Sequence, residues 1–383
     1  MMQFVAQRDM KEGMCVAEDV CDDHGRTLIA HGQRIGLHHI ARMRKFRIES
    51  IFIDPNNGEA LVKPTKTELR ERCVKVLKGA FCQVSQDFTE KKIALEAAAI
   101  KDVSGGLVDA LMQSKNPLVT LVDISAGPDK TLQHSVNTAV LAVVLAIDMH
   151  IPEAMLRELA IAMLFHDIGT IFLPDELVKM TRPLNVDEAQ LMRQHVQLGC
   201  DHLLRNNAIG SVAASIILRH HETINGAGYP NGVPDEKLTT LMKIAHVVEV
   251  YDTLTTGRPW MPAVLPDIAI SYIISNAGRL FAKDVVIKLC QRIALYPVGS
   301  AVQLTTGECG IVAGILPKAP TRPVLLVHYD HRGNLLKSPI VVDLMRDLNR
   351  AIVRSAPTLP QLLQAKSGEL ILRPVNPVLA NLG

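Results

Sequence analysis

The pattern of apolar and polar positions divides the chain into a helical centre and two flanks with short strands. Between residues 129 and 294, apolar stretches with helical spacing recur, and each ends at Gly, Pro or Asn. This pattern predicts an all-helical domain of ordinary size. Residues 1–62 instead alternate short apolar runs with turn residues, which predicts a small N-terminal α/β or β unit with one helix near residues 38–46. The fold class that we expect is therefore mainly α.

The remaining segments are predicted from the same signals. Residues 63–128 contain a capping-box pattern between Thr65 and Glu68 and then helical spacing, so we expect a helical linker region there. Residues 295–346 alternate apolar and polar positions between turn glycines, which is typical of a small C-terminal β unit. The last segment, residues 347–383, is rich in Leu and Pro and predicts a short helix followed by a tail.

Composition excludes several classes of protein. The 383 residues include 41 basic and 39 acidic side chains, and this balance gives no field that favours nucleic acid. The most apolar stretch, Ala139 to Ile147, is well short of the roughly 20 residues that a membrane span needs, so we expect no transmembrane helix. We expect no secretory signal, because no basic segment leads into an apolar core at the N-terminus, and the seven scattered cysteines fit reduced thiols. We therefore expect a cytoplasmic protein.

Five of the fourteen histidines lie together in the predicted helical domain. A histidine taken alone is more often hydrogen-bonded or solvated than a metal ligand, but the grouping changes the interpretation. His166 and Asp167 follow a buried apolar run, where an imidazole beside a carboxylate suits a metal ion. His220 and His221 are adjacent at another apolar helix end, where two large polar rings would be costly to pack without partners. The five histidines are His134, His166, His195, His220 and His221.

Carboxylates inside apolar sequence are further candidates. Glu249 lies among valines in a predicted helix, and a charge there needs a partner. Asp252, about one turn further on, shares the face of Glu249 and is either an alternative ligand or a group that orients a ligating histidine. Glu222, next to the paired histidines, is a second candidate for such a supporting role. The five histidines, Asp167 and Glu249 give seven candidate ligands.

The ordered motifs resemble those of the HD-GYP family of bacterial phosphodiesterases. They run from His134 to Pro259, about a third of the chain, in the family's order and near its spacing. The flanking units also look similar to the family's architecture. The motifs are His134, Leu164-Phe165-His166-Asp167-Ile168-Gly169, His195, His220-His221-Glu222, Gly226-Ala227-Gly228-Tyr229-Pro230, Val248-Glu249-Val250-Tyr251-Asp252-Thr253-Leu254-Thr255 and Arg258-Pro259.

The resemblance implies a metal-dependent phosphodiesterase that opens cyclic di-GMP to linear pGpG, GMP or both. A hydroxide held between two divalent ions, most often iron or manganese, would attack the phosphodiester. Asp167 and His166 would be the catalytic residues, with Asp167 bridging the two ions. The resemblance implies that one ion binds His134, His166 and Glu249 and that the other binds His195, His220 and His221.

The resemblance also implies roles in binding the substrate and partners. Tyr229 would contact a phosphate or base and Arg258 a phosphate, beside Gly228 and Pro230 in a tight loop. The alternative interpretation of this loop is a structural turn. The partners that we expect are cyclic di-GMP, diguanylate cyclase domains of the GGDEF type and a second copy of the chain. Neither nucleic acid nor a membrane span is expected.

Five positions depart from the family pattern. Thr170 and Met261 stand where family members have basic residues, so phosphate recognition has lost contacts worth roughly 1.5–3 kcal/mol each. Asn225 replaces an Asp, Glu249 replaces an Asp ligand, and Lys130 replaces a Glu that holds a third metal in some members. We therefore expect two ions and leave room for low activity. Two alternatives stay open, a weakly active or inactive metal-loaded sensor or scaffold for cyclic dinucleotides and an HD phosphohydrolase acting on another phosphoester.

Overall fold

The structure is a computed structural model that describes a large part of the chain. Contacts within the chain divide it into two units, residues 1–68 and 69–383. The capping-box pattern near Thr65 and most of the predicted helical linker lie outside the described residues. The described residues are 3–6, 10, 12–16, 20–21, 27–30, 33–45, 50–54, 97–113, 130–316, 319–356 and 358–364.

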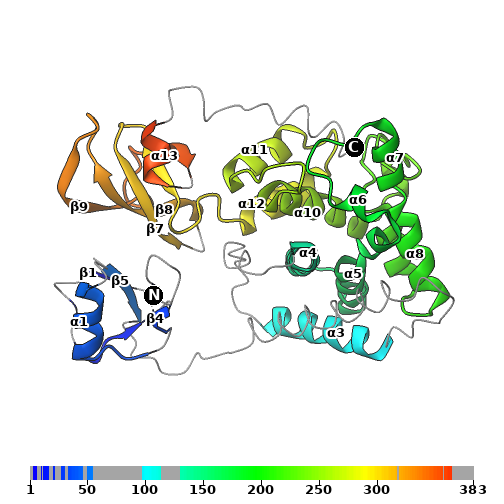
Figure 1. The fold of residues 1–383 in the computed structure, drawn as a ribbon, viewed down its shortest axis with the longest axis horizontal. Helices are drawn as coiled ribbons and strands as arrows, with labels where there is room; N and C mark the ends of the chain where they lie inside the picture. The colour runs from blue at the N-terminus through cyan, green and yellow to red at the C-terminus, as the bar shows by residue number, and fades with distance from the viewer. Residues whose placement is uncertain are drawn as a thin grey trace. The chain divides into compact units, whose positions relative to one another are not determined.

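The N-terminal unit combines short strands with one helix, as its turn-rich pattern predicted (Figure 1). Its three-stranded antiparallel sheet has the order β1-β5-β2, and β3 pairs with β4. A small apolar core that includes Val16, Ile29, Met43 and Ile51 holds the unit together. The elements are β1 (Gln3–Ala6), β2 (Cys15–Val16), β3 (Val20–Cys21), β4 (Thr27–Ile29), α1 (Leu37–Lys45) and β5 (Ser50–Asp54).

The second unit begins with helices that share one apolar core. This confirms the predicted helical domain. The α-helices are α3 (Ala97–Gln113), α4 (Lys130–Asp148), α5 (Glu153–Phe165), α6 (Asp175–Val178), α7 (Val186–Met192), α8 (His195–Arg205), α9 (Ser211–Arg219), α10 (Thr240–Thr256), α11 (Pro266–Ser275) and α12 (Lys283–Arg292). Two 3-10 helices, η3 (Ile168–Phe172) and η4 (Asp235–Lys237), lie between them.

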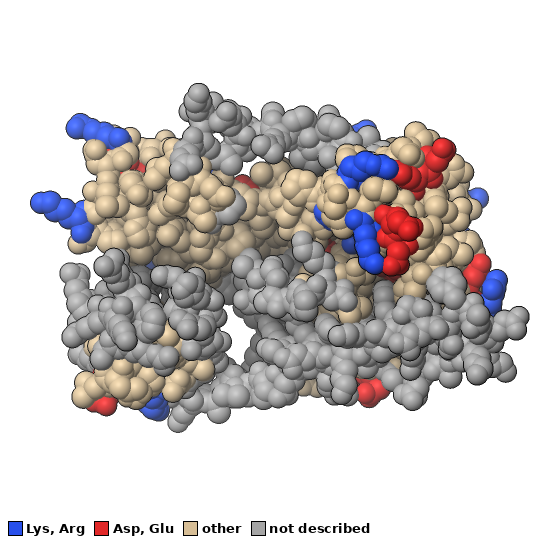
Figure 2. Space-filling model, viewed as in Figure 1, with Lys and Arg blue, Asp and Glu red and all other residues tan. Residues whose placement is uncertain are grey.

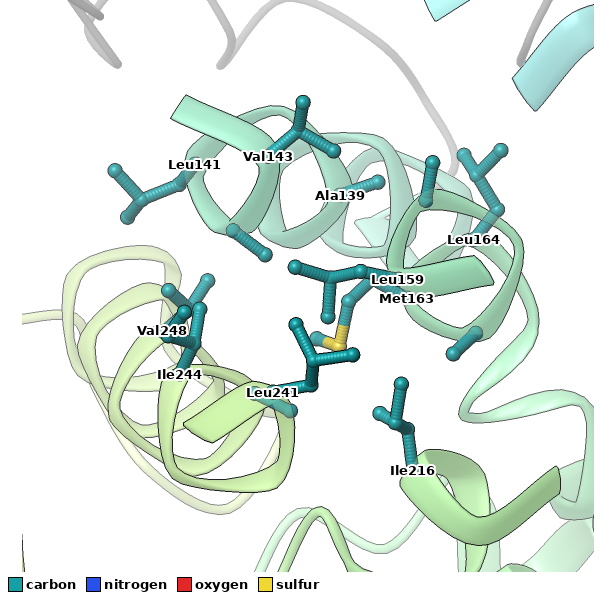
Figure 3. Packing of buried hydrophobic residues seen from close by; sticks show 14 of the residues in the cluster. Ala139, Leu141, Val143, Leu159, Met163, Leu164, Ile216, Leu241, Ile244 and Val248 are labelled. Carbon is teal, nitrogen blue, oxygen red and sulfur yellow. The ribbon is translucent and has the colours of Figure 1, made fainter. Parts of the chain in front are cut away.

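Helix α10 lies at the centre of this core. From Leu241 to Leu254 every residue except Lys243 is buried, and a helix that is covered on all sides must be enclosed by other helices. Figure 3 shows side chains from α4, α5, α9 and α10 converging, among them Leu159 and Ile216. The carboxylates of α10 are therefore held inside the core and not on its surface.

Helix α4 differs from our expectation about membrane spans. Within the described residues, the segment Thr131–Asp148 is long and apolar enough by composition to cross a membrane, whereas we expected no such segment. In the structure 72% of this segment is buried by the rest of the protein. Its apolar side chains thus pack as those of a core helix.

A capping-box pattern at Asn185-Val186-Asp187-Glu188 predicts one helix that runs on through His195, whereas the structure divides this helix in two. Helix α7 does begin at the predicted capping box, in which the side chains of Asn185 and Glu188 each accept a hydrogen bond from the other residue's backbone N–H at 2.9 Å. However, α7 ends at Met192, and α8 starts at His195 after a short turn. The turn lets the His195 ring bond a backbone carbonyl of the preceding helix, which the apolar pattern could not reveal.

The C-terminal part is an antiparallel five-stranded sheet with the order β10-β6-β7-β8-β9. Strand β10 lies in the segment that we predicted as a tail, so the β unit continues past residue 346. It pairs with β6, almost 50 residues earlier, and such a distant pairing leaves no local signal. Helix α13 (Leu359–Gln364) is the short helix that we predicted there. The strands are β6 (Ala301–Leu304), β7 (Cys309–Leu316), β8 (Ala319–Tyr329), β9 (Leu335–Asp343) and β10 (Ile352–Ala356).

Charged side chains on the visible face are scattered. Figure 2 shows the described Lys and Arg side chains beside Asp and Glu side chains, with no extended area of one sign among the described residues on that face. Oppositely charged side chains also form ion pairs, such as Arg182 with Glu188 at 2.8 Å. This distribution fits the near-balanced net charge.

Candidate metal centre

The seven predicted ligands come together inside the helical domain. Two lie within helices, His134 in α4 and Glu249 in α10. The others stand at helix ends, where the backbone turns away and the side chain can face inward. His166 caps α5, Asp167 precedes η3, His195 opens α8, and His220 and His221 end α9. All seven residues are at most 7% exposed.

Three of the histidines are oriented by the same hydrogen bond. The Nδ1 atoms of His166, His195 and His220 bond to the carbonyl three residues earlier, at 2.8, 2.8 and 2.7 Å. A carbonyl oxygen only accepts, so Nδ1 is the donor and Nε2 of the neutral ring keeps its lone pair. Fixing one ring nitrogen in this way is how proteins orient a ligating histidine.

We call His134, His166 and Glu249 the first cluster. The Nε2 atoms of the two histidines are 3.2 Å apart, and Oε2 of Glu249 lies 2.7 Å from His134 Nε2 and 3.1 Å from His166 Nε2. Donor atoms that share one ion at about 2.1 Å lie roughly 3 to 3.5 Å from one another. Two of the three distances lie in this range and the third is shorter, so the three donors converge closely enough to share one ion.

We call His195, His220 and His221 the second cluster. Each offers one ring nitrogen, and the three nitrogens lie within 4.8 Å of one another. His195 Nε2 and His220 Nε2 are 3.4 Å apart. Three imidazoles at this spacing are a donor set suited to a divalent transition metal.

Asp167 lies between the two clusters. Its Oδ2 atom is 3.7 Å from His134 Nε2 and 3.5 Å from His166 Nε2, whereas its Oδ1 atom is 3.4 Å from His195 Nε2. One carboxylate thus presents a different oxygen to each cluster. The residues fit a pair of ions that share this carboxylate.

The first cluster is rich in negative charge. Burial by itself lowers the pKa of His134, but the charge of Glu249 and hydrogen bonds to Asp252 and Glu249 raise it to about 9. Burial also opposes ionisation of Glu249, yet His134 and His166 hold its pKa well below the usual range. Without a metal, this cluster therefore holds a proton at neutral pH.

The second cluster has the opposite character. Burial, together with the charges of the neighbouring His166 and His195, lowers the pKa of His220 to about 3. Burial likewise holds the pKa of His221 well below its usual value and lowers that of His195. These rings are neutral at pH 7, which is the form that binds metal.

Asp252 supports the first cluster. Its Oδ2 atom accepts a hydrogen bond from His134 Nδ1 at 2.6 Å, so it takes the orienting place that was one of its two predicted roles. Its Oδ1 atom accepts from Asn137 at 3.0 Å. Thr253 donates its hydroxyl to Glu249 Oε1 at 2.9 Å. Our sequence interpretation missed Asn137 and Thr253, although each lies about one turn from a predicted ligand.

Glu222 supports the loop, and among the described residues its carboxylate has no hydrogen bond to a histidine. It is 2% exposed, and its two carboxylate oxygens accept from the backbone N–H groups of Asn231 at 2.8 Å and Val233 at 3.1 Å. Gly228 packs against the same segment so closely that a Cβ atom there would lie 2.4 Å from the carbonyl oxygen of His221. The loop is therefore fastened to the backbone of the paired histidines, while Pro230 at its tip is exposed.

Tyr229 lies against the second cluster. Its ring stacks on His221 with 4.5 Å between ring centroids and an interplanar angle of 19°. The guanidinium carbon of Arg193 lies over the same ring, 5.1 Å from its centroid. Burial, with the charges of Glu249 and Asp167, holds the pKa of Tyr229 well above its usual value, so the phenol stays neutral.

Arg258 points at the first cluster. Its Nη2 atom lies 3.0 Å from Glu249 Oε1, 3.0 Å from Thr253 Oγ1 and 3.6 Å from Asp167 Oδ2. It is also 3.1 Å from His134 Nε2. The guanidinium thus neutralises buried carboxylates, a role beyond the phosphate contact that we predicted.

Neither of two departures from the family pattern, Thr170 and Met261, supplies a cation at the centre. The Thr170 hydroxyl donates to the Asp167 carbonyl at 2.7 Å and so closes the turn that carries Asp167. Met261 is 5% exposed and belongs to the apolar core. Its backbone pairs with that of Arg258 at 2.8 and 2.9 Å, which fixes the turn behind the guanidinium.

Our sequence interpretation also missed His246 and Arg193. His246 is buried in α10, stacks on Phe281 and donates through Nδ1 to the His220 carbonyl at 3.2 Å. It thereby positions the turn that carries the paired histidines. His246 lies one turn before Glu249, a spacing that could have identified it.

Comparison with known proteins agrees with this geometry. Residues 120–285 match the HD domain family, and residues 301–358 match a KOW domain associated with the HD domain. The match confirms the resemblance that the motifs indicated. The chain is thus similar to the HD domain family over the region that contains the seven predicted ligands.

Several characterised relatives are similar over much of the chain. The cyclic di-GMP phosphodiesterase PA4108 of Pseudomonas aeruginosa is 30% identical over 253 residues, which are 66% of this chain and 61% of that protein. The cyclic di-GMP phosphodiesterase response regulator RpfG of Xanthomonas campestris is 29% identical over 223 residues, 58% of each chain. This chain therefore spans less than two thirds of the length of either relative. The solved structure of Bd1817, an HDG"Y"P protein of Bdellovibrio bacteriovorus, matches 76% of this chain and 98% of its own at 17% identity and a TM-score of 0.48.

Proposed function

We propose that the HD domain of this chain hydrolyses cyclic di-GMP as a metal-dependent phosphodiesterase. The observation that carries this proposal is the position of Asp167, whose two oxygens face two separate histidine clusters. A carboxylate shared in this way is the arrangement that a pair of ions needs. The names of the similar relatives support cyclic di-GMP as the substrate.

Each cluster would hold one divalent ion. His134, His166 and Glu249 would bind the first ion and His195, His220 and His221 the second, with Asp167 shared. Imidazole and carboxylate donors together suit iron or manganese, the ions that we propose. When bound, such a pair supplies Lewis acidity, which lowers the pKa of a water between the ions and stabilises charge on phosphoryl oxygens.

The protein groups around the clusters would then position the diester. Tyr229, fastened beside His221 by the loop of Gly228 and Pro230, would limit how the nucleotide enters the second cluster. Arg258 would contact a phosphate oxygen near the first cluster, since a guanidinium offers donors that match a phosphate. Asp252 and Glu222 would keep His134 and the loop in place. Attack on one phosphodiester opens the ring to pGpG, and a second cut gives GMP.

The test is hydrolysis by the purified chain. The protein is reconstituted with iron or manganese under reducing conditions, incubated with cyclic di-GMP and followed by chromatography. We expect pGpG or GMP to form, and we expect Asp167→Ala to abolish it. Asp187→Ala, which removes an exposed carboxylate of α7, is the matched control and should keep activity.

The other outcomes distinguish the remaining hypotheses. Tight binding of cyclic di-GMP without turnover would identify a metal-loaded sensor or scaffold. Neither binding nor turnover, with hydrolysis of another phosphoester, would identify a different HD phosphohydrolase. A cytoplasmic location, GGDEF-type partners and a homodimer remain predictions for this chain.

A further inference from the structure

Two arginines lie close to the metal centre, and each is associated with a different cluster. Arg258 approaches the carboxylates of the first cluster. Arg193 lies over the ring of Tyr229, which stacks on His221 of the second cluster. Of these two arginines, only Arg258 was among the substrate contacts that we assigned from the sequence. Arg193 is therefore a cation at the second cluster without a stated function.

The position of Arg193 is set by the backbone around it. It is the C-cap residue of α7, two residues before His195, where the chain turns into α8. Segment η3 packs tightly on the start of α8, because a Cβ atom at Gly169 would lie 1.9 Å from the carbonyl oxygen of His195. This packing fixes the turn that carries Arg193 relative to Asp167 and to the second cluster.

The charges of the two clusters differ in a way that makes a cation useful here. The first cluster contains Glu249 and is already approached by Arg258. The second cluster has three neutral imidazoles and shares only one oxygen of Asp167. An anionic diester is therefore opposed by fewer protein carboxylates at the second cluster than at the first.

Other groups near the centre do not supply that cation. Thr170 uses its hydroxyl within its own turn, and Met261 is buried in the apolar core. Arg258 is held by Glu249 and Thr253 on the other side of the centre. A guanidinium over an aromatic ring keeps its N–H donors in its own plane, where they can still form charge-assisted bonds.

We infer that Arg193 is a substrate-binding residue that donates to a phosphate oxygen of the cyclic dinucleotide beside the second cluster. This inference rests on the proposed function. A cyclic dinucleotide has two phosphates, and one arginine at each cluster matches that count. Tyr229 then has a second task, because its ring holds the guanidinium in position.

The experiment compares Arg193→Gln with Arg193→Lys in the metal-loaded full chain. The ligand is a phosphorothioate analogue of cyclic di-GMP that resists hydrolysis, and its Kd is measured by calorimetry at two salt concentrations. Losing a charge-assisted contact should weaken binding by roughly 10-fold or more in Arg193→Gln, and Lys should restore part of it. The salt dependence of Kd should also become shallower in Arg193→Gln, because a direct contact to an anion has been lost. Arg205→Gln, an exposed arginine at the end of α8, is the matched control and should bind within about twofold of the unaltered chain.

Metal content and thermal unfolding of each variant separate binding from folding. The inference holds if Arg193→Gln keeps two ions and its unfolding temperature while Kd rises. It is overturned if Kd stays within twofold of the unaltered chain, or if Kd rises only because metal is lost. Failure of the unaltered chain to bind the analogue would overturn both this inference and the proposed function. Binding without turnover by the unaltered chain would contradict the enzyme and leave the test of Arg193 intact.

Discussion

The first and second clusters use the same residue type in opposite electrostatic settings. In the first, carboxylates around His134 raise its pKa to about 9, and Arg258 lies against the same carboxylates. In the second, burial among other histidines lowers the pKa of His220 to about 3. An ion entering the first cluster must displace a proton and a guanidinium, whereas an ion entering the second meets neutral rings. The two ions should therefore differ in what their binding requires: the first has to displace a proton and the guanidinium of Arg258, and the second does not.

The largest effect is expected when one ligand is removed from each cluster in turn. His220→Ala should lose the ion of the second cluster and His134→Ala the ion of the first, so each variant should fall from two ions per chain to one. Metal analysis after dialysis measures this directly. His331→Ala, an exposed histidine of the β unit, should keep both ions. Retention of two ions by His220→Ala would show that the clusters are not separate sites.

A smaller effect should come from the residue behind His134. Asp252→Asn leaves the ring without its carboxylate partner at 2.6 Å, and loss of such partners typically weakens metal affinity by about 10- to 100-fold. Only the affinity for the ion of the first cluster should fall, as measured by titration with Mn²⁺. Asn137 donates to Asp252 and not to the ring itself, so Asn137→Ala should have a smaller effect in the same direction. An equal loss of affinity for both ions would contradict two separate metal sites.

The pH dependence of metal binding should also differ. Because the pKa of His134 is raised to about 9 in the metal-free chain, His134 is protonated at neutral pH and a proton competes with the ion. Affinity at the first cluster should therefore increase with pH, by up to about tenfold per unit between pH 6 and 8. With a pKa of about 3 for His220, affinity at the second cluster should change little over this range. Mn²⁺ titrations of His220→Ala and His134→Ala at several pH values isolate the two sites.

The smallest effect concerns Arg258 and the metal-free protein. Arg258→Gln leaves the buried carboxylates of Glu249 and Asp167 with less positive charge, at a cost on the order of 1–3 kcal/mol. The unfolding temperature of the metal-free chain should fall by a few degrees, and metal should remove most of that difference. Thermal unfolding with and without Mn²⁺ measures both values. An equal loss of stability in the metal-loaded protein would mean that Arg258 has a different structural role.

Residues with local signals could be singled out from the sequence. His166, Asp167, His220 and His221 follow apolar runs, and the structure does bring them together with His134, His195 and Glu249. The helical domain and the short strands of both flanks also followed from periodicity. Each of these signals is contained within a few neighbouring residues, which is why the sequence alone revealed them.

Features that depend on distant contacts were not predicted. Strand β10 was assigned to a tail because its partner β6 is far away in the chain. The break in the helix before His195 was missed because no pattern of apolar residues indicates the hydrogen bond between the His195 ring and the Met192 carbonyl. The positions of Arg193 and His246 depend on how the helices pack, which no local sequence pattern indicates. The position of Arg258 against the carboxylates is likewise set by a turn paired with Met261.

The most direct test of the shared two-ion centre is to count the ions bound by the unaltered chain. The protein is loaded with Mn²⁺ at pH 8, dialysed and measured beside Asp167→Ala and the control Asp187→Ala. Since Asp167 faces both clusters, we predict two ions per chain in the unaltered protein and in the control, and weakened binding of both ions in Asp167→Ala. A chain that binds no ion, or an Asp167→Ala variant that keeps two ions as tightly as the unaltered chain, would contradict the shared two-ion centre.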